Sequence, residues 1–168
     1  MKVYLIGYMG SGKTTIGKII AEKMQWKFVD MDSVIETKYG MEVAEIFRTY
    51  GEQEFRGAEQ DLLKELAEEE NAVISTGGGV PCFFDNMAQM NRNGKTFYIK
   101  FSPEKLAQRL LETNISKRPV LQAAGDNLEK FIAETLSERE VFYEQASDKV
   151  TGTDENIVES ILYKLKHR

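Results

Sequence analysis

Residues 2–15 read KVYLIGYMGSGKTT. The segment 3–6 is short, apolar and β-branched at Val3 and Ile6, which is typical of a buried strand. Residues 7–14 then match the pattern G-x-x-x-x-G-K-[ST] at every fixed position. A strand that runs into this glycine-rich loop and then into a helix is typical of a phosphate-binding P-loop. We therefore predict an α/β domain organised around a nucleotide phosphate site.

The residue types in this loop suit the chemistry of a polyphosphate. Its glycines let successive backbone N–H groups point at the phosphates, and the helix that follows directs the positive end of its dipole at the same anion. Lys13 supplies a point charge for the β- and γ-phosphates, and Thr14 supplies a hydroxyl for Mg²⁺. A glycine-rich turn that binds nothing is the alternative, which the register of strand, glycines, lysine and threonine disfavours. The predicted nucleotide-binding residues are Gly10, Ser11, Gly12, Lys13, Thr14 and Thr15.

Length and composition limit the functions that such a loop could serve. The 168 residues fit one domain, and a hydrophobic content of 42% is enough for a single core. A net charge of -5, with Lys and Arg scattered along the chain, argues against a nucleic-acid binder. No apolar run approaches the roughly 20 residues of a membrane span, and no leader precedes the first strand, so we expect a cytoplasmic protein.

Cysteine and histidine are too few for several kinds of site. The chain has one cysteine, Cys82, and one histidine, His167. A single cysteine excludes an intrachain disulfide. A single histidine next to the end of the sequence excludes histidine-based catalysis, and the two counts together exclude a His/Cys metal site. Any metal is therefore expected to be a hard, oxygen-bound ion that arrives with a nucleotide.

Strand-like and helix-like segments alternate along the rest of the chain. Five strands separated by helices predict right-handed crossovers and a parallel, three-layer α/β/α sheet with ligands at the carboxyl ends of its strands. The predicted strands are 3–6, 28–29, 72–75, 96–101 and 148–151. The predicted helices are 15–24, 33–39, 43–50, 52–70, 82–91, 103–112, 127–146 and 156–166, and residues 113–125 are predicted to form a loop that moves.

Polar residues follow two of these strands directly. Asp30 and Asp32 alternate along the extended end of the second strand, so one is predicted to face the water shell of a metal and the other a second substrate. A helix N-cap at Asp32 is the alternative. Thr76 and the triple glycine 77–79 follow the third strand, where glycines let the backbone approach a ligand closely.

The segment FRGAE, residues 55–59, lies in a long helical pattern. Its Arg56 and Glu59 are three residues apart and share a helix face. A surface ion pair of little energetic value is the ordinary interpretation. The alternative is that Glu59 orients the Arg56 guanidinium towards a carboxylate.

Together these motifs resemble the shikimate kinases. The match extends from residue 3 to about residue 150, with the motifs in family order. Each later motif is weak alone, but their joint order and spacing are specific. The motifs are GYMGSGKT (7–14), Asp30-Met31-Asp32, FRGAE (55–59), TGGG (76–79), Lys117-Arg118-Pro119, and Arg139 before Phe142-Tyr143.

The resemblance implies a fold like that of the nucleoside monophosphate kinases. The five parallel strands would lie in the order 2-3-1-4-5, within a single domain over residues 1–168. A substrate-binding insertion would occupy about 31–60 and a lid about 112–125. The implied reaction is Mg²⁺-dependent transfer of the γ-phosphate of ATP to the 3-hydroxyl of shikimate, in aromatic amino acid biosynthesis.

The resemblance also implies residues for the acceptor, shikimate. Asp32 would bind the hydroxyls of the acceptor and lie near the attacking oxygen. Arg56 and Arg139 would hold the acceptor's carboxylate. Gly78 and Gly79 would present backbone N–H groups to it.

For the metal and the phosphates, the resemblance implies a second group of residues. Thr14 would bind the metal directly, whereas Asp30 and Thr76 would act through water. The implied catalytic residues are Lys13, Asp32 and Arg118, the last of which would reach the phosphates with the lid. Segments 111–114 and 151–156 lack the arginines that many members place near adenine, so no adenine contact is assigned.

Three rival functions stay open. A kinase for gluconate or a nucleoside monophosphate is the nearest, but two arginines with a triple glycine favour a carboxylated polyol. A GTP-dependent switch usually carries N-K-x-D, and the similar segment 147–150 lacks its Asn and its Asp. A non-catalytic ATP-binding regulator is disfavoured by the joint presence of Lys13, Asp32 and Arg118. We expect a monomer, because no exposed apolar stripe requires a partner.

Overall fold

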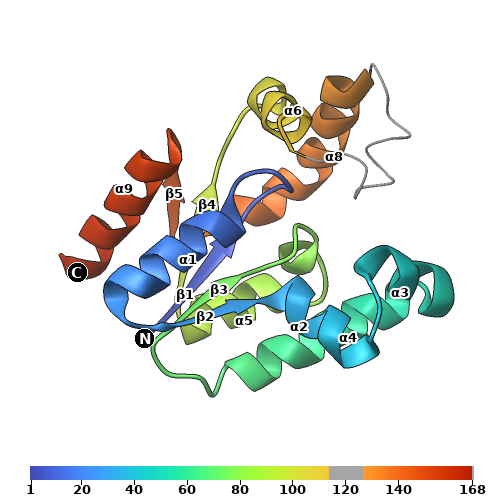
Figure 1. The fold of residues 1–168 in the computed structure, drawn as a ribbon, viewed down its shortest axis with the longest axis horizontal. Coiled ribbons are helices and arrows are strands. Elements are labelled where there is room, and N and C mark those ends of the chain that lie inside the picture. Colours follow the sequence, from blue (N-terminus) through green and yellow to red (C-terminus); the bar gives the residue numbers. More distant parts are fainter. Residues whose placement is uncertain (114–126, 168) are drawn as a thin grey trace.

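The computed structural model describes residues 1–113 and 127–167. Its centre is a sheet of five parallel strands in the order β2-β3-β1-β4-β5 (Figure 1). The predicted fold class and strand order are confirmed. The strands are β1 (Lys2–Ile6), β2 (Lys27–Asp30), β3 (Ala72–Ser75), β4 (Lys95–Ile99) and β5 (Asp148–Val150).

Helices cover both faces of the sheet and so produce three layers (Figure 1). On one face α1 (Lys13–Met24) packs beside α9 (Asp154–Lys166). On the other face lie α5 (Asn86–Asn93) and α8 (Leu128–Tyr143), and α6 (Pro103–Leu111) packs against α8. Because both faces are covered, β1 and β3 bury nearly every side chain, as parallel strands usually do.

Three helices connect β2 to β3 in the stretch expected to form the insertion. They are α2 (Met31–Tyr39), α3 (Val43–Tyr50) and α4 (Glu52–Leu66), and α2 and α3 project from the side of the sheet (Figure 1). Gly40 and Gly51 end α2 and α3, as their positions in the sequence predict. The insertion therefore stands beside the carboxyl end of β2, next to the P-loop.

The helix predicted to run to about residue 70 ends at Leu66. The side chain of Lys2 explains this early end, because its Nζ donates to the carbonyl of Ala67 at 2.7 Å and to that of Glu69 at 3.0 Å. A glutamate-rich continuation would also place negative charge at the negative end of the helix dipole. The helix prediction is wrong for residues 67–70.

The predicted helix 82–91 is also wrong at its start. The short 3-10 helix η1 (Val80–Cys82) comes first, and α5 begins only at Asn86. Between η1 and α5, Phe84 adopts a left-handed backbone conformation with φ 52°, so the two helices are not continuous. At the P-loop the helix begins earlier than predicted: α1 starts at Lys13, whereas the prediction placed the start at residue 15.

Candidate active site

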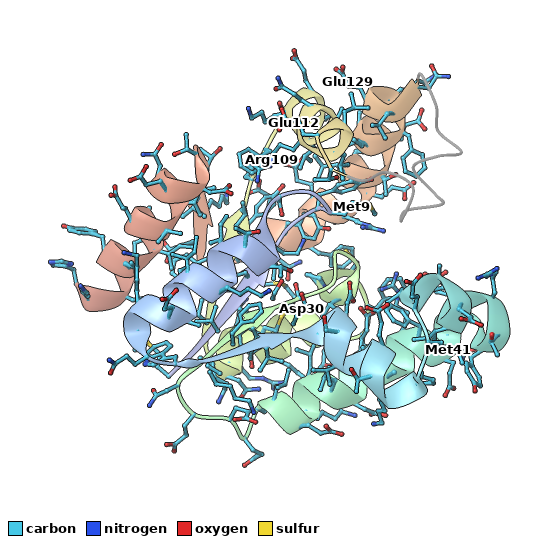
Figure 2. The ribbon with its side chains drawn as sticks, in the orientation of Figure 1. Met9, Asp30, Met41, Arg109, Glu112 and Glu129 are labelled. Carbon is cyan, nitrogen blue, oxygen red and sulfur yellow. The ribbon has the colours of Figure 1, made fainter. Side chains whose placement is uncertain are left out.

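The carboxyl ends of β1, β2 and β3 bring the predicted polar residues to one edge of the sheet. Ser75 lies in register with Leu5 of β1 on one side and with Asp30 of β2 on the other. Figure 2 shows Asp30 at the end of β2 and Met9 in the P-loop above it. The two polar segments predicted from the sequence therefore do meet beside the P-loop.

The P-loop has the shape of a phosphate cradle. Lys13 is buried and its Nζ donates to the carbonyls of Gly7 at 2.7 Å and Tyr8 at 3.0 Å, so the ammonium group lies inside the loop. Gly12 has φ 92°, and a Cβ there would lie 2.8 Å from Nη2 of Arg109. A side chain at this position would therefore be strained and crowded, which explains the glycine physically.

Oxygen donors gather at the start of α1. The hydroxyl of Thr14 donates to Oδ2 of Asp30 at 2.7 Å and lies 3.5 Å from the hydroxyl of Ser75. Such a set of hydroxyl and carboxylate oxygens is the kind that Mg²⁺ prefers. Ser75 is not among the predicted site residues. Its position at the end of the predicted strand 72–75, directly before Thr76, is the feature of the sequence that could have indicated it. The hydroxyl of Thr76, by contrast, donates to the carbonyl of Leu5 at 3.0 Å.

The predicted alternation of Asp30 and Asp32 along an extended strand end is wrong. β2 ends at Asp30 and α2 begins at Met31. Oδ1 of Asp30 accepts from the backbone N–H of Ser33 at 3.1 Å, so Asp30, not Asp32, is the N-cap of α2. Asp32 therefore lies in the first turn of the helix and not on the strand.

Asp32 lies against the triple glycine. A Cβ at Gly77 would lie 2.9 Å from Oδ1 of Asp32. Burial raises the pKa of Asp32 above its ordinary value, the charge of Asp30 adds to the rise, and the charge of Lys13 opposes it. A carboxylate with a raised pKa, close to the P-loop lysine, is a suitable acceptor for a hydroxyl proton.

Arg56 and Glu59 form a buried ion pair rather than the exposed pair of the ordinary interpretation. Nη1 of Arg56 donates to Oε1 of Glu59 at 2.6 Å, and the two side chains are 11% and 1% exposed. A Cβ at Gly79 would lie 2.6 Å from Nη2 of Arg56, so only glycine lets the guanidinium come this close. The burial raises the pKa of Glu59 to about 7, although Arg56 lowers it.

Arg139 approaches the same loop from α8. Its guanidinium carbon lies 5.6 Å from the ring centre of Tyr8, and a Cβ at Gly78 would lie 3.1 Å from its Nη1. One turn later on α8, the buried hydroxyl of Tyr143 donates to the carbonyl of Gly78 at 2.5 Å. Two arginines from different helices thus converge on adjacent glycines, which is an arrangement suited to a small carboxylate.

Arg118 and most of the predicted lid, residues 112–125, lie outside the described residues. The predicted role of Arg118 therefore stays a prediction.

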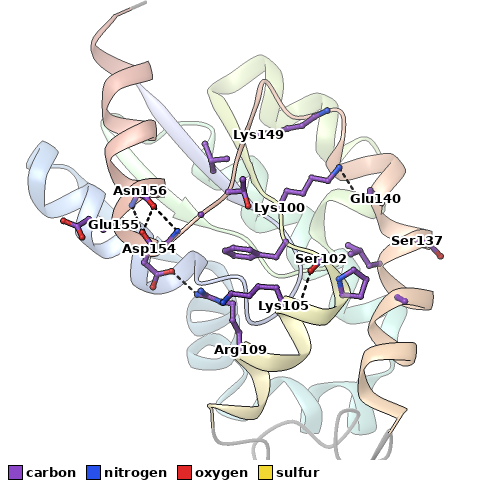
Figure 3. Close-up of a pocket in the computed structure, with 18 residues that line it drawn as sticks. Lys100, Ser102, Lys105, Arg109, Ser137, Glu140, Lys149, Asp154, Glu155 and Asn156 are labelled. Carbon is purple, nitrogen blue, oxygen red and sulfur yellow. Dashed lines mark hydrogen bonds and ion pairs between the residues drawn. The ribbon is translucent and has the colours of Figure 1, made fainter.

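Beside the P-loop, at the carboxyl ends of β4 and β5, lies a cavity of about 1350 Å³ (Figure 3). Arg109 separates it from the P-loop: its Nε donates to the carbonyl of Gly10 at 2.8 Å and its Nη2 to Oδ1 of Asp154 at 3.0 Å. The guanidinium carbon also lies 4.8 Å from the ring centre of Phe101. Arg109 was not predicted from the sequence, because nothing local indicates a contact with a residue as distant as Gly10.

A protein-family model described as shikimate kinase matches residues 9–168 of the chain. The chain belongs to the shikimate kinase family. The family assignment makes it an ATP-dependent kinase that acts on shikimate and uses Mg²⁺, as the motifs imply.

Individual members of the family are similar along nearly the whole chain. A shikimate kinase of Azobacteroides pseudotrichonymphae is 43% identical over 98% of this chain and 99% of its own length. The crystal structure of a shikimate kinase from Bacteroides thetaiotaomicron superposes with a TM-score of 0.93 at 41% identity, covering 99% of this chain and 98% of that one. A shikimate kinase from Acinetobacter baumannii, solved in complex with shikimate, gives a TM-score of 0.88 at 32% identity, covering 98% and 92% of the two chains.

Proposed function

We propose that the edge of the sheet between the P-loop and the triple glycine is where the γ-phosphate of ATP passes to the 3-hydroxyl of shikimate, giving shikimate 3-phosphate and ADP. One observation carries the assignment of residues. Arg56 and Arg139 come from separate helices and meet at Gly79 and Gly78, with Asp32 across the same loop. A carboxylate held by the two arginines would place the hydroxyls of the acceptor towards Asp32 and the phosphates.

The P-loop and the oxygen donors beside it fit MgATP. Its backbone N–H groups and Lys13 would hold the β- and γ-phosphates, and the start of α1 adds the positive end of its dipole. Thr14 would bind the metal directly, whereas Asp30, Thr76 and Ser75 would contact its water shell. Within residues 1–113 and 127–167 no group of three or more His, Cys, Asp or Glu side chains could hold a metal. Phosphate oxygens and water would supply the other ligands of the Mg²⁺, as is usual for this ion.

Phosphoryl transfer passes through a loose transition state with charge on the transferred oxygens. The protein contributes alignment and positive charge, here Lys13 and the loop N–H groups, so Asp32 need be only a modest base. The raised pKa of Asp32 suits that role, because a carboxylate of higher pKa accepts the hydroxyl proton more readily. Gly78 and Gly79 would orient the acceptor through their N–H groups.

Arg118 and the lid complete this proposal. Closure of residues 112–125 over the phosphates would bring Arg118 to the transferred group and exclude the water that would otherwise hydrolyse ATP. The nucleoside would occupy the cavity bordered by Arg109 and by residues 151–156. The position of this cavity beside the P-loop supports this place for adenine. The domain would then comprise the whole of residues 1–168, with the insertion at 31–60 as its acceptor-binding part.

The protein is proposed to act as a cytoplasmic monomer that binds no nucleic acid. Within the described part of the chain, no helix has both the length and the apolar character to span a bilayer. The net charge of -5 supports the absence of a nucleic-acid surface. Light scattering tests the monomer, for which the expected mass is that of one chain of 19.2 kDa. A mass of two chains would contradict it.

A coupled assay of ADP release with Mg²⁺ and ATP tests the assignment. We expect ADP only when shikimate is added, and Asp32→Asn should lower kcat by about 100-fold, within the range of general base catalysis. Asp61→Asn, on the exposed face of α4, is the matched control and should keep the wild-type rate. Activity with gluconate or nucleoside monophosphates instead of shikimate, or full activity in Asp32→Asn, would contradict the assignment.

A further inference from the structure

The ring of Phe83 lies under the guanidinium of Arg56. The guanidinium carbon is 4.3 Å from the ring centre of Phe83, closer than to the rings of Phe55 at 5.4 Å or Phe47 at 5.7 Å. At this distance a cation over an aromatic face is attracted by the ring's quadrupole. Because the Arg56 side chain is only 11% exposed, little water screens the contact.

Phe83 differs from the other two rings in what else it contacts. Phe55 belongs to the buried hydrophobic core and Phe47 packs against that core, with the two ring centres 4.8 Å apart. Phe83 belongs to neither group and is only partly buried. Its position is therefore not explained by packing in the core, and of the three rings it lies closest to the Arg56 guanidinium.

The segment that carries Phe83 is fixed on both sides. The N–H of Cys82 donates to the carbonyl of Gly79 at 3.0 Å, which closes the turn of η1 after the triple glycine. The fully buried side chain of Asn86 donates to the carbonyl of Val80 at 2.9 Å. The backbone that carries Phe83 is thus fixed on both sides, and its position is tied to that of Gly79.

The remaining contacts of Arg56 leave one edge of the guanidinium for a ligand. Nη1 is taken by Glu59 at 2.6 Å, and Nε has a long contact of 3.5 Å with Glu52. Within the part of the chain that the structure describes, Nη2 makes no hydrogen bond and lies against Gly79. A planar guanidinium with one face on a ring can bind a carboxylate only in its own plane.

We infer that Phe83 is a positioning residue for the acceptor, which sets the plane of the Arg56 guanidinium so that its free edge meets the carboxylate of shikimate beside Gly79. The inference rests on the proposed place of Arg56 in the acceptor site. Glu59 fixes one end of the guanidinium and Phe83 fixes its tilt. Loss of the ring would let the guanidinium tilt out of the plane in which it binds the carboxylate.

Steady-state kinetics of Phe83→Leu test this inference. We expect the KM for shikimate to rise about fivefold to tenfold, as for loss of one partly desolvated cation–π contact, while kcat and the KM for ATP stay within about twofold. Phe83→Tyr keeps the ring and should keep the wild-type KM. Phe83→Met, which has a side chain of similar size without an aromatic face, should behave like the leucine variant, so the inference stays testable if the leucine variant folds poorly. Phe84→Leu is the matched control, because Phe84 is 60% exposed and has no contact with Arg56.

A variant of Arg56 separates failure of this inference from failure of the proposed site. Arg56→Leu should raise the KM for shikimate more than Phe83→Leu does, and adding Phe83→Leu to it should have no further effect. An unchanged KM in Arg56→Leu would overturn the proposed acceptor site and the inference together. A raised KM in Arg56→Leu with a wild-type KM in Phe83→Leu and Phe83→Met would overturn the role of Phe83 alone.

Discussion

Glu59 is the most buried carboxylate of the proposed acceptor site, and its raised pKa makes its charge depend on pH near neutrality. The side chain is 1% exposed, and only one of its oxygens has a hydrogen-bond partner among the described residues. Burial raises its pKa to about 7 from an ordinary value of 4.5, against the lowering effect of Arg56. The pair with Arg56 therefore orients the guanidinium at a cost in stability, which is typical of buried ion pairs.

The raised pKa predicts how stability changes with pH. Between about pH 4.5 and pH 7 the folded chain holds a proton on Glu59 that the unfolded chain has lost, so this group makes the free energy of unfolding fall as pH rises through that window. Glu59→Gln removes the titration. We expect the change in unfolding free energy between pH 4.5 and pH 8 to differ between the two proteins by about 3 kcal/mol, with the wild type losing more.

Urea unfolding at several pH values measures this difference. Carboxylates distant from Glu59 titrate equally in both proteins, so their effects cancel in the comparison. Glu144→Gln is the control. Glu144 is a half-buried carboxylate at the C-cap of α8, and hydrogen bonds from Lys100 and Lys149 lower its pKa. The folded chain therefore loses this proton before the unfolded chain does, and the stability trend from Glu144 has the opposite sign. Parallel stability curves for the wild type and Glu59→Gln would contradict the expected titration.

At the scale of elements, Arg109 connects three parts of the nucleotide side. It lies on α6, donates to the P-loop carbonyl of Gly10, and pairs with Asp154 in the first turn of α9. The loop and the two helices thus hold one another through a single side chain, at the rim of the cavity assigned to the nucleoside (Figure 3). On the acceptor side, the hydrogen bonds that Arg56 makes with described residues go to Glu52 and Glu59 and not to this group.

Substitution of Arg109 is therefore expected to affect the nucleotide and not the acceptor. Arg109→Ala should raise the KM for ATP by about tenfold, since it removes two hydrogen bonds, one of them to a charged partner, that order the loop. The KM for shikimate should stay within about twofold. Arg92→Ala, at an exposed position on α5, is the control of the same residue type. Steady-state kinetics with each substrate varied in turn would contradict the prediction if both KM values rose together.

The elements also show what the sequence could and could not predict. Strand, P-loop and helix are adjacent in the chain, so local spacing was enough to predict the cradle around Lys13. The order of the strands and the family came from several short motifs taken together. The contacts Arg109–Gly10 and Tyr143–Gly78 span 99 and 65 residues. No local pattern records such contacts, because they depend on how whole helices pack.

Helix boundaries failed for related reasons. The end of α4 depends on Lys2, a residue 65 positions away from Ala67, and the start of α2 depends on which of two aspartates caps the helix. The stack of Phe83 on Arg56 could not be predicted either, since η1 and a left-handed Phe84 replace the regular helix expected there. At the end of α4 a side chain from a distant part of the chain decides the local backbone, whereas the start of α2 depends on a cap three residues away.

At the scale of the whole molecule, the proposed acceptor site draws on segments far apart in the chain. Asp32 lies on α2, Arg56 on α4, the triple glycine after β3, and Arg139 on α8. These segments meet only in the folded chain, so shikimate can bind the folded state and not the unfolded one. Binding of this kind stabilises the whole fold by mass action.

Thermal unfolding with shikimate alone tests this last consequence. At a ligand concentration of about 100 times Kd the stabilisation is about 2.7 kcal/mol, which for a chain of this size raises Tm by roughly 5–10 °C. Arg56→Leu should lose most of that rise at the same concentration, whereas Arg92→Ala should keep it, because Arg92 lies on α5 with its side chain 70% exposed. The uncharged carboxamide of shikimate should give a much smaller rise with the wild type, since the arginines would lack their anionic partner. An equal rise in Tm for the wild type and Arg56→Leu would mean that shikimate stabilises the fold from somewhere other than the site between α4 and α8.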